Sequence, residues 1–193
     1  KYKNIPVPTS YMAIQSKYDF VGGYEDDVRG GLLHVADHHV SPGKKQWTWG
    51  NGDFGKAWDR NLTDEDGPYI ELMTGMYTDN QPDFSWLQPY EEKSWVQYFM
   101  PYSEVGYVKN ATKDALLNVE LKDGNARLVL YTSGVNKDVH LLVKDVRGTL
   151  LFDKTIQVSP AEPFIATFPA EGLKEEEIRV EVRDSEGKVM LTY

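Results

Sequence analysis

Seven short runs of apolar or alternating residues fill the chain from residue 116 to its last residue. LLNVEL (116–121) and ARLVLYT (126–132) are separated by the turn-forming stretch KDGN (122–125), and IRVEVRD (178–184) alternates apolar with charged residues. Alternation of this kind predicts a strand with one solvated face. Strands at regular spacing, joined by Gly, Asn and Asp turns, are typical of a β-sandwich. The other runs are DVHLLVKD (138–145), TLLFDKTIQVS (149–159), PFIATF (163–168) and KVMLTY (188–193).

Aromatic residues are concentrated in the other part of the chain. Nineteen of them precede residue 110, including all five tryptophans, and five follow. GGLLHVADHHV (30–40), GPYIELMTGMYT (67–78) and SWVQYFMPY (94–102) resemble strands, and long polar stretches lie between them. Loops of this length are uncommon unless they are functional. We therefore predict two domains, residues 1–112 and 113–193, with the function in the first.

Charge and composition exclude several classes of partner. The net charge of -9 argues against nucleic acid, because neutralising phosphates needs a basic surface. No run approaches the roughly 20 apolar residues of a membrane helix, so we expect no membrane insertion. Cysteine is absent, which excludes disulfides and thiol catalysis and leaves the compartment open. A periplasmic or extracellular location is preferred over the cytoplasm, and no cofactor is expected.

The stretch HVADHH (34–39) contains three of the four histidines. On a straight strand His34 and His38 share a face but lie about 13 Å apart at ~3.3 Å per residue, too far for two ligands of one zinc ion. His38 and His39 could both bind a metal only if the backbone bends there. We therefore expect no metal site and keep His34 and His38 as candidates for acid–base work.

The stretch GKKQWTWG (43–50) places Trp47 and Trp49 two residues apart on one expected strand face, with Lys45 beside them. Aromatic rings stack on the apolar faces of sugars, while nearby cationic and amide groups hydrogen-bond the hydroxyls. These three residues are therefore candidates for binding a carbohydrate. The alternative is that the tryptophans are hydrophobic core.

The stretch YIEL (69–72) places Glu71 between apolar neighbours on an expected strand. A carboxylate there could line a cleft and act as a base. It could equally form a structural ion pair with a lysine or arginine.

The loop TDNQPDFSWLQPYE (78–91) is rich in groups that make directional hydrogen bonds, together with an aromatic ring. Two prolines would stiffen it and reduce the cost of ordering it on binding. Its candidates for binding a sugar are Asn80, Gln81, Asp83 and Trp86.

The run from HVADHH through KKQWTW and YIEL to the end of this loop (34–95) resembles an uncharacterised domain family of bacterial proteins. Such domains often precede tetratricopeptide repeats and are similar to the galactose mutarotase superfamily; the resemblance covers roughly residues 5–112. It implies part of an antiparallel β-supersandwich for these residues. Together with the small immunoglobulin-like β-sandwich expected from the strand pattern of residues 113–193, the whole chain is expected to be all-β. The N-terminal half of the supersandwich is expected to lie outside these residues. The resemblance also implies His34 or His38 as general acid and Glu71 as general base.

Three functions follow as expectations. The first is a carbohydrate-active domain that binds a sugar or glycan in an aromatic-lined cleft, and hydrolyses or epimerises it by His/Glu chemistry. The second is a non-catalytic carbohydrate-binding module of a larger tetratricopeptide-repeat protein, whose repeats would be its partners. The third, ranked last, is a metal-assisted hydrolase built on the histidines of HVADHH and Asp37.

Overall fold

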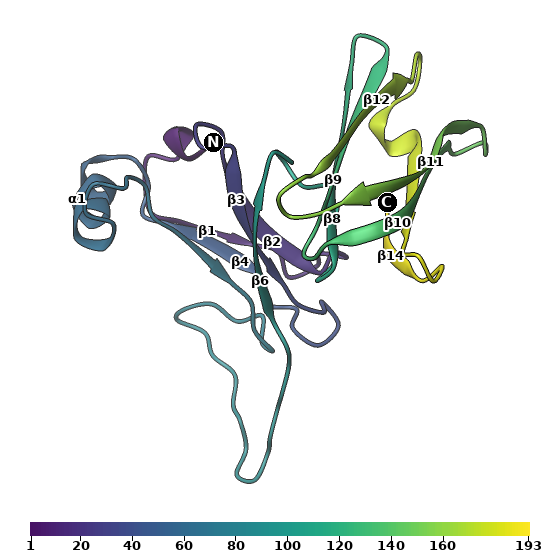
Figure 1. The fold of residues 1–193 in the computed structure, drawn as a ribbon. Coiled ribbons are helices and arrows are strands. Elements are labelled where there is room, and N and C mark those ends of the chain that lie inside the picture. Colours follow the sequence, from purple (N-terminus) through teal and green to yellow (C-terminus); the bar gives the residue numbers. More distant parts are fainter. The chain divides into compact units, whose positions relative to one another are not determined.

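The computed structural model describes residues 1–193, which form four sheets of antiparallel strands with little helix (Figure 1). This confirms the all-β fold class. By packing, the chain separates into two compact units: unit 1 comprises residues 1–21 and 36–97, and unit 2 comprises residues 22–35 and 98–193. The sequence boundary expected at residues 112–113 stays a prediction. No helix is long and apolar enough to cross a membrane.

The last part of unit 2 is a β-sandwich. Two four-stranded sheets, in the orders β11-β10-β13-β14 and β12-β9-β8-β7, form it. Every run expected to be a strand there is one, because alternating residues supply an apolar face to each sheet. The strands are β7 (Asn110–Ala111), β8 (Ala115–Lys122), β9 (Asn125–Thr132), β10 (Asn136–Asp145), β11 (Leu150–Val158), β12 (Phe164–Pro169), β13 (Ile178–Arg183) and β14 (Val189–Thr192), and the short helix η2 (Glu175–Glu177) precedes β13.

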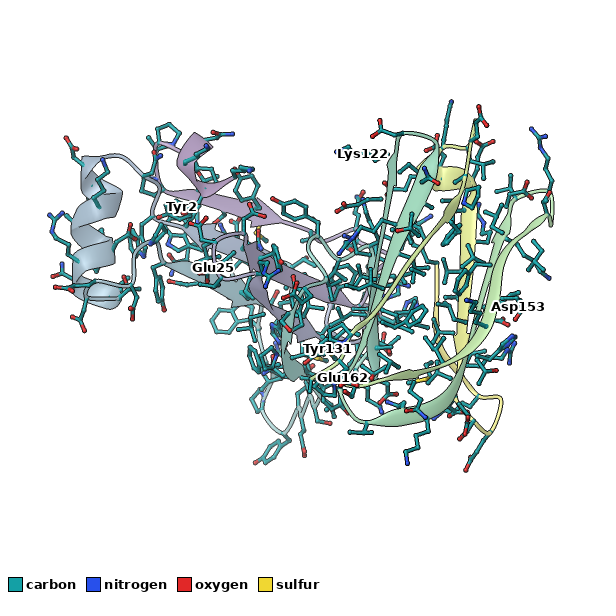
Figure 2. All side chains as sticks on the ribbon, turned by 45° about the horizontal axis from the view of Figure 1, so that its top comes forward. Tyr2, Glu25, Lys122, Tyr131, Asp153 and Glu162 are labelled. Atoms are coloured by element: carbon teal, nitrogen blue, oxygen red, sulfur yellow. The ribbon has the colours of Figure 1, made fainter.

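The hydrophobic core lies between these two sheets. Leu117 and Leu128 from one sheet and Leu141 and Val180 from the other are buried in a single apolar cluster. In the sheet β11-β10-β13-β14, side chains that alternate with these core residues point to solvent, and Asp153 of β11 is one of them (Figure 2). This pattern is the sheet-on-sheet packing of a sandwich.

Unit 2 also contains most of a three-stranded sheet in the order β2-β3-β6. Its strands are β2 (Phe20–Glu25), β3 (Gly30–Val35) and β6 (Tyr98–Ser103). The Tyr131 hydroxyl of β9 donates to the Pro101 carbonyl at 3.0 Å, and the buried Asn118 amide of β8 donates to the Val105 carbonyl at 2.8 Å. These bonds tie β6 and the residues after it to the sandwich.

Unit 1 contains the sheet β1-β4-β5, the helix α1 and the short helix η1. Their bounds are η1 (Tyr2–Asn4), β1 (Thr9–Met12), β4 (Lys45–Thr48), α1 (Asp53–Leu62) and β5 (Ile70–Met73). Ala36 is the one fully buried apolar side chain of this unit. Most side chains of the β1-β4-β5 sheet are therefore half-exposed or exposed, whereas the sandwich of unit 2 encloses a buried apolar core.

The helix α1 lies in a stretch that the sequence led us to expect as a polar loop. Phe54 and Trp58, four residues apart, fall on one side of the helix, and both contact Trp49. Asp59 of the helix accepts a hydrogen bond from the Tyr69 amide at 3.2 Å. The helix forms because two aromatic rings anchor one of its faces.

The strand expected over residues 30–40 ends at Val35. Asp37 causes the break: its Oδ1 accepts the His39 amide at 2.8 Å, and its carbonyl accepts the Ser41 amide at 2.8 Å. Such local bonds from Asp compete with sheet pairing and turn the chain. The prediction that His34 and His38 share one strand face is therefore wrong, because His38 lies in a turn.

Candidate functional site

Three of the expected site residues lie on one face of the β1-β4-β5 sheet. In the antiparallel register Trp47 of β4 pairs with Ser10 of β1 and with Glu71 of β5. Directly paired residues project to the same side of a sheet with Cβ atoms about 5 Å apart, so the indole and the carboxylate are neighbours. Lys45, two residues before Trp47, projects to the same side.

Asn80 joins this group through its side chain. Lys45 Nζ donates to Asn80 Oδ1 at 2.8 Å. Asn80 comes from the segment 74–97 that connects β5 to β6, drawn in Figure 1 as a long loop without helix or strand. An ammonium and a primary amide each carry further N–H donors, so this pair can still bind hydroxyl oxygens. We refer to Lys45, Trp47, Glu71 and Asn80 together as the Trp47 face.

The Glu71 carboxylate is half-buried and forms no hydrogen bond or ion pair with another side chain. The structural ion pair considered as the alternative for Glu71 is therefore not found. Its oxygens can accept hydrogen bonds from a ligand.

Trp49 has a packing role. Its ring stacks on Trp58 of α1, with centroids 4.4 Å apart and planes at 13°, and meets Trp47 edge-on at 5.3 Å. Its indole Nε1–H is buried without an acceptor. Trp49 thus connects β4 to α1 and supports Trp47 from the side, which corresponds to the core alternative for one of the two tryptophans.

The other loop candidates make contacts within their own segment. Trp86 is 72% exposed, packs edge-on against Phe84 and accepts the Tyr77 hydroxyl on its carbonyl at 3.3 Å. Gln81 and Asp83 are exposed. The Asp83 amide donates to the Asn80 carbonyl at 2.8 Å, whereas no hydrogen bond or ring contact joins the side chains of these three residues to the Trp47 face.

His34 is buried in β3, where its ring stacks on Phe99 of β6 at 4.6 Å and 12°. It belongs to unit 2, whereas Glu71 belongs to unit 1. Burial and stacking on a ring of the neighbouring strand are typical of a side chain that packs in the interior. The expected acid–base pairing of His34 with Glu71 stays a prediction.

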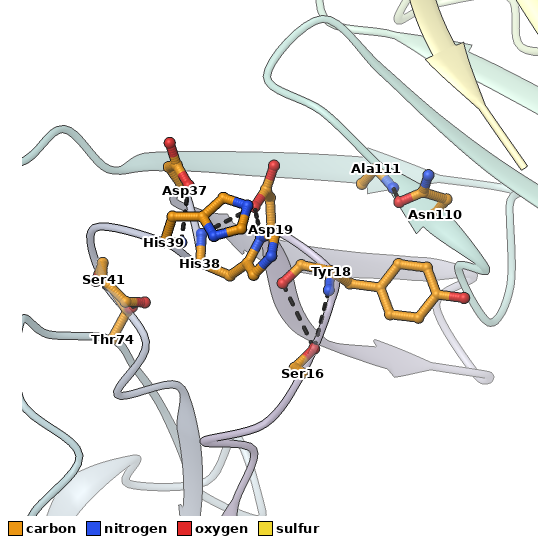
Figure 3. Close-up of polar contacts among 10 residues, drawn as sticks. All are labelled: Ser16, Tyr18, Asp19, Asp37, His38, His39, Ser41, Thr74, Asn110 and Ala111. Carbon is orange, nitrogen blue, oxygen red and sulfur yellow. Dashed lines mark hydrogen bonds and ion pairs between the residues drawn. The ribbon is translucent and has the colours of Figure 1, made fainter.

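His38 lies in the turn that follows β3 and is held by Asp19 (Figure 3). Asp19 Oδ1 lies 2.7 Å from His38 Nδ1 and also accepts the His38 amide at 2.9 Å. Burial alone raises the pKa of Asp19, but the hydrogen bonds from His38 outweigh it and hold that pKa below its usual value. The neighbouring His39 ring lies 3.9 Å from the His38 ring.

Lys44 is the largest fully buried polar side chain, 1% exposed, and its Nζ has no hydrogen-bond partner. Burial lowers its pKa, and the charges of Asp19 and Asp37 partly counter that effect. The segment holding it is fixed at Gly43, whose amide donates to the Gly75 carbonyl at 3.0 Å. A Cβ on Gly43 would lie 2.0 Å from the Tyr77 carbonyl, so the chain passes too close for any side chain.

Asp19 and Lys44 were not identified from the sequence. Asp19 is a single acidic residue in a polar stretch, and Lys44 is one of two adjacent lysines. Only the packing of distant segments makes them notable, because no local pattern marks either one.

Two family models match successive parts of the chain. Residues 1–102 match the family model described as a domain of unknown function, DUF5107. The chain belongs to this family. Beyond the DUF5107 region, residues 110–193 match the model described as YphG-like protein, second domain. No solved structure matches the chain. The expectation of an uncharacterised domain family is thereby confirmed, and the Trp47 face lies within its DUF5107 region.

Proposed function

We propose that the DUF5107 region binds carbohydrate on the Trp47 face. The observation that carries the proposal is the pairing of Trp47 with Glu71 across β4 and β5, beside the Lys45–Asn80 hydrogen bond. Four residues from three separate segments thus supply one ring, one carboxylate, one ammonium and one amide on a single half-exposed surface.

These four groups match the chemistry of a sugar. The C–H face of a pyranose packs on the apolar face of an indole, which removes apolar area of both from water. Glu71 accepts hydrogen bonds from hydroxyls, whereas Lys45 and the Asn80 amide donate to hydroxyl oxygens. Acceptor and donors on either side of a ring would orient the bound sugar.

Binding without turnover is the better supported form of this function. Most glycosidases use a pair of carboxylates that flank the bond. Glu71 is the one carboxylate on the Trp47 face, whose other neighbours in the sheet are Ser10, Met12 and Met73. Epimerisation with Glu71 as base is the second candidate, favoured because that carboxylate has no protein partner.

The resemblance to the galactose mutarotase superfamily supports carbohydrate as the ligand class. The same resemblance makes the tetratricopeptide repeats of a longer parent protein the proposed partners. In that arrangement the domain would deliver a bound glycan to the repeats or be presented by them.

A glycan array, followed by calorimetry on the best ligand, tests the proposal with the 193-residue chain. Trp47→Ala should weaken binding by about tenfold or more, since truncating a central tryptophan at a binding surface commonly costs over ~1 kcal/mol and ~1.4 kcal/mol corresponds to tenfold. Glu71→Gln, which keeps one acceptor oxygen, should weaken it less. Trp95→Ala is the matched control, because Trp95 is a partly exposed tryptophan of unit 1 that is not on the Trp47 face.

Equal affinities in the wild type and Trp47→Ala would contradict the Trp47 face as the binding surface. If Glu71→Gln retains binding but abolishes conversion of a labelled aldose, the epimerase form of the proposal is correct instead.

A further inference from the structure

The turn after β3 gathers three side chains that can each offer one metal ligand. Asp37, His38 and His39 are consecutive, and their carboxylate and imidazole ligand atoms all lie within 4.8 Å of one another. Asp37 and His39 are exposed, and His38 is half-buried, so the group is open to solvent. The backbone bend that this arrangement requires is supplied by the hydrogen bonds of Asp37 described above.

Asp19 orients one of these ligands. Its Oδ1 bonds both the His38 amide and His38 Nδ1 (Figure 3), which fixes the ring and places the proton of a neutral imidazole on Nδ1. The lone pair then lies on Nε2. Metal-binding histidines almost always have such a carboxylate or carbonyl partner on the ring nitrogen that does not bind the ion.

We propose that Asp37, His38 and His39 bind a divalent transition-metal ion, with Asp19 as the positioning residue for His38. Two imidazole nitrogens and one carboxylate oxygen suit Zn²⁺ and its neighbours in the first transition row, whereas Mg²⁺ and Ca²⁺ prefer oxygen ligands alone. The inference concerns the turn alone and does not depend on carbohydrate binding at the Trp47 face.

The charges around the turn favour a cation. The Asp19 and Asp37 carboxylates are negative, and both lie close enough to Lys44 to counter the lowering of its pKa by burial. Lys44 is fully enclosed by the protein, so its ammonium cannot swing out to form an ion pair with the exposed Asp37 carboxylate. Asp37 therefore keeps its free oxygen for the ion.

The ligand count predicts what the ion can do. Structural zinc sites are closed by four protein ligands, whereas sites with three keep a position for water or another molecule. Three consecutive residues of a tight turn also occupy one side of the ion and leave the other to solvent. The proposed site is therefore one that binds a further oxygen ligand.

Calorimetric titration of the chelator-treated, tag-free 193-residue chain with ZnCl₂ tests the site. One equivalent of Zn²⁺ should bind, and His38→Ala and His39→Ala should each weaken binding by at least about tenfold, whereas MgCl₂ should give no heat of binding at that site. His140→Ala is the matched control. His140 also lies 2.7 Å from an aspartate oxygen, that of Asp153, but has no second histidine beside it.

Asp19→Asn should weaken Zn²⁺ binding about 10–100-fold, the usual effect of removing the partner of a metal-binding histidine. It should also shift the visible absorption of the Co²⁺-loaded chain, a readout that a purely structural role would not move. Circular dichroism of each variant without metal verifies folding, and His39→Ala removes only an exposed ring.

Three outcomes would overturn the proposal. They are the absence of saturable Zn²⁺ binding by the wild type, equal binding by His39→Ala in a folded chain, and an equal loss of binding in His140→Ala.

Discussion

At the scale of single residues, Lys44 is the least expected feature of the structure. Its ammonium is buried without a hydrogen-bond acceptor, which is costly for a charged group. Burial lowers its pKa, and Asp19 and Asp37 compensate only in part. The folded chain therefore holds this proton more weakly than the unfolded chain does.

Replacing Lys44 with methionine, which fills a similar volume without charge, should raise the free energy of unfolding by up to about 3 kcal/mol at neutral pH. At pH values between the lowered pKa of Lys44 and the ordinary lysine pKa, the unfolded wild type binds more protons than the folded wild type. The free energy of unfolding of the wild type therefore rises with pH in this range. Lys44→Met lacks this dependence. Urea unfolding of both chains from neutral to alkaline pH measures this: the difference between their free energies of unfolding should shrink as pH rises. A wild type that is more stable than Lys44→Met by the same amount at every pH would contradict the prediction.

At the scale of elements, α1 depends on a glycine within the helix. A Cβ on Gly55 would lie 1.7 Å from the Gly50 carbonyl oxygen, because the helix packs directly on the chain after β4. Glycine within a helix usually costs up to about 1 kcal/mol relative to alanine, so the ordinary expectation is that Gly→Ala stabilises. Because Gly55 lies so close to the Gly50 carbonyl oxygen, Gly55→Ala is expected to destabilise the chain instead.

We expect Gly55→Ala to lower the free energy of unfolding by about 1–3 kcal/mol, the usual cost of forcing extra atoms into a packed site. Lys56→Ala at the exposed neighbouring position is the control and should change it by less than about 0.5 kcal/mol. Thermal or denaturant unfolding measures both. An equally or more stable Gly55→Ala would show that α1 does not sit against Gly50.

The sandwich core should respond to truncation far more than its surface does. Leu128 of β9 is fully buried in the core cluster, whereas Leu150 of β11 is 56% exposed. Leu128→Ala should cost about 2–5 kcal/mol, because it removes buried apolar atoms and leaves a cavity. Leu150→Ala should cost less than about 1 kcal/mol by the same denaturant measurement. Similar losses in the two variants would argue against the register of β9.

Elements with a regular pattern were predictable from the sequence, and those fixed by distant contacts were not. IRVEVRD and ARLVLYT became β13 and β9 almost residue for residue, because alternation alone specifies a strand with one buried face. The helix α1 was missed because its larger apolar residues, Phe54, Trp58 and Leu62, stand among glycine, charged and polar residues. A weak apolar pattern of this kind needs Trp49 opposite it before a helix becomes favourable.

The candidate site likewise has features that local sequence predicts and features that depend on distant contacts. Lys45 and Trp47 could be placed on one face from their spacing, but the pairing of Trp47 with Glu71 depends on the register between β4 and β5. Nothing local gives that register. The turn at Asp37 replaced the expected strand because one side-chain hydrogen bond outweighed the apolar character of the flanking residues.

At the scale of the whole molecule, the two units differ in how they are stabilised. Every buried apolar side chain except Ala36 belongs to unit 2. Apolar burial contributes roughly 25 cal/mol per Å², so the cohesive energy of the chain is concentrated in the sandwich and the sheet tied to it. Unit 1 relies on its strand pairing and on aromatic contacts around Trp49.

Native-state hydrogen exchange should therefore show two levels of protection. Amides of β8, β9, β10 and β13 should exchange slowest, through opening events close to global unfolding, and those of β1, β4 and β5 should exchange through smaller openings. Mass spectrometry of peptides from each strand measures this. Equal protection of β4 and β9 would mean that unit 1 draws its stability from interactions other than apolar burial.

The placement of the tryptophans has a practical consequence. All five lie in unit 1, and unit 2 has only tyrosine and phenylalanine rings. Indole fluorescence will therefore report on unit 1 alone, and the stacked Trp49–Trp58 pair should give a coupled circular dichroism signal that disappears when α1 detaches from β4. The chain thus carries a built-in optical probe of unit 1, which can follow a ligand bound at the Trp47 face without a label and without a contribution from the sandwich.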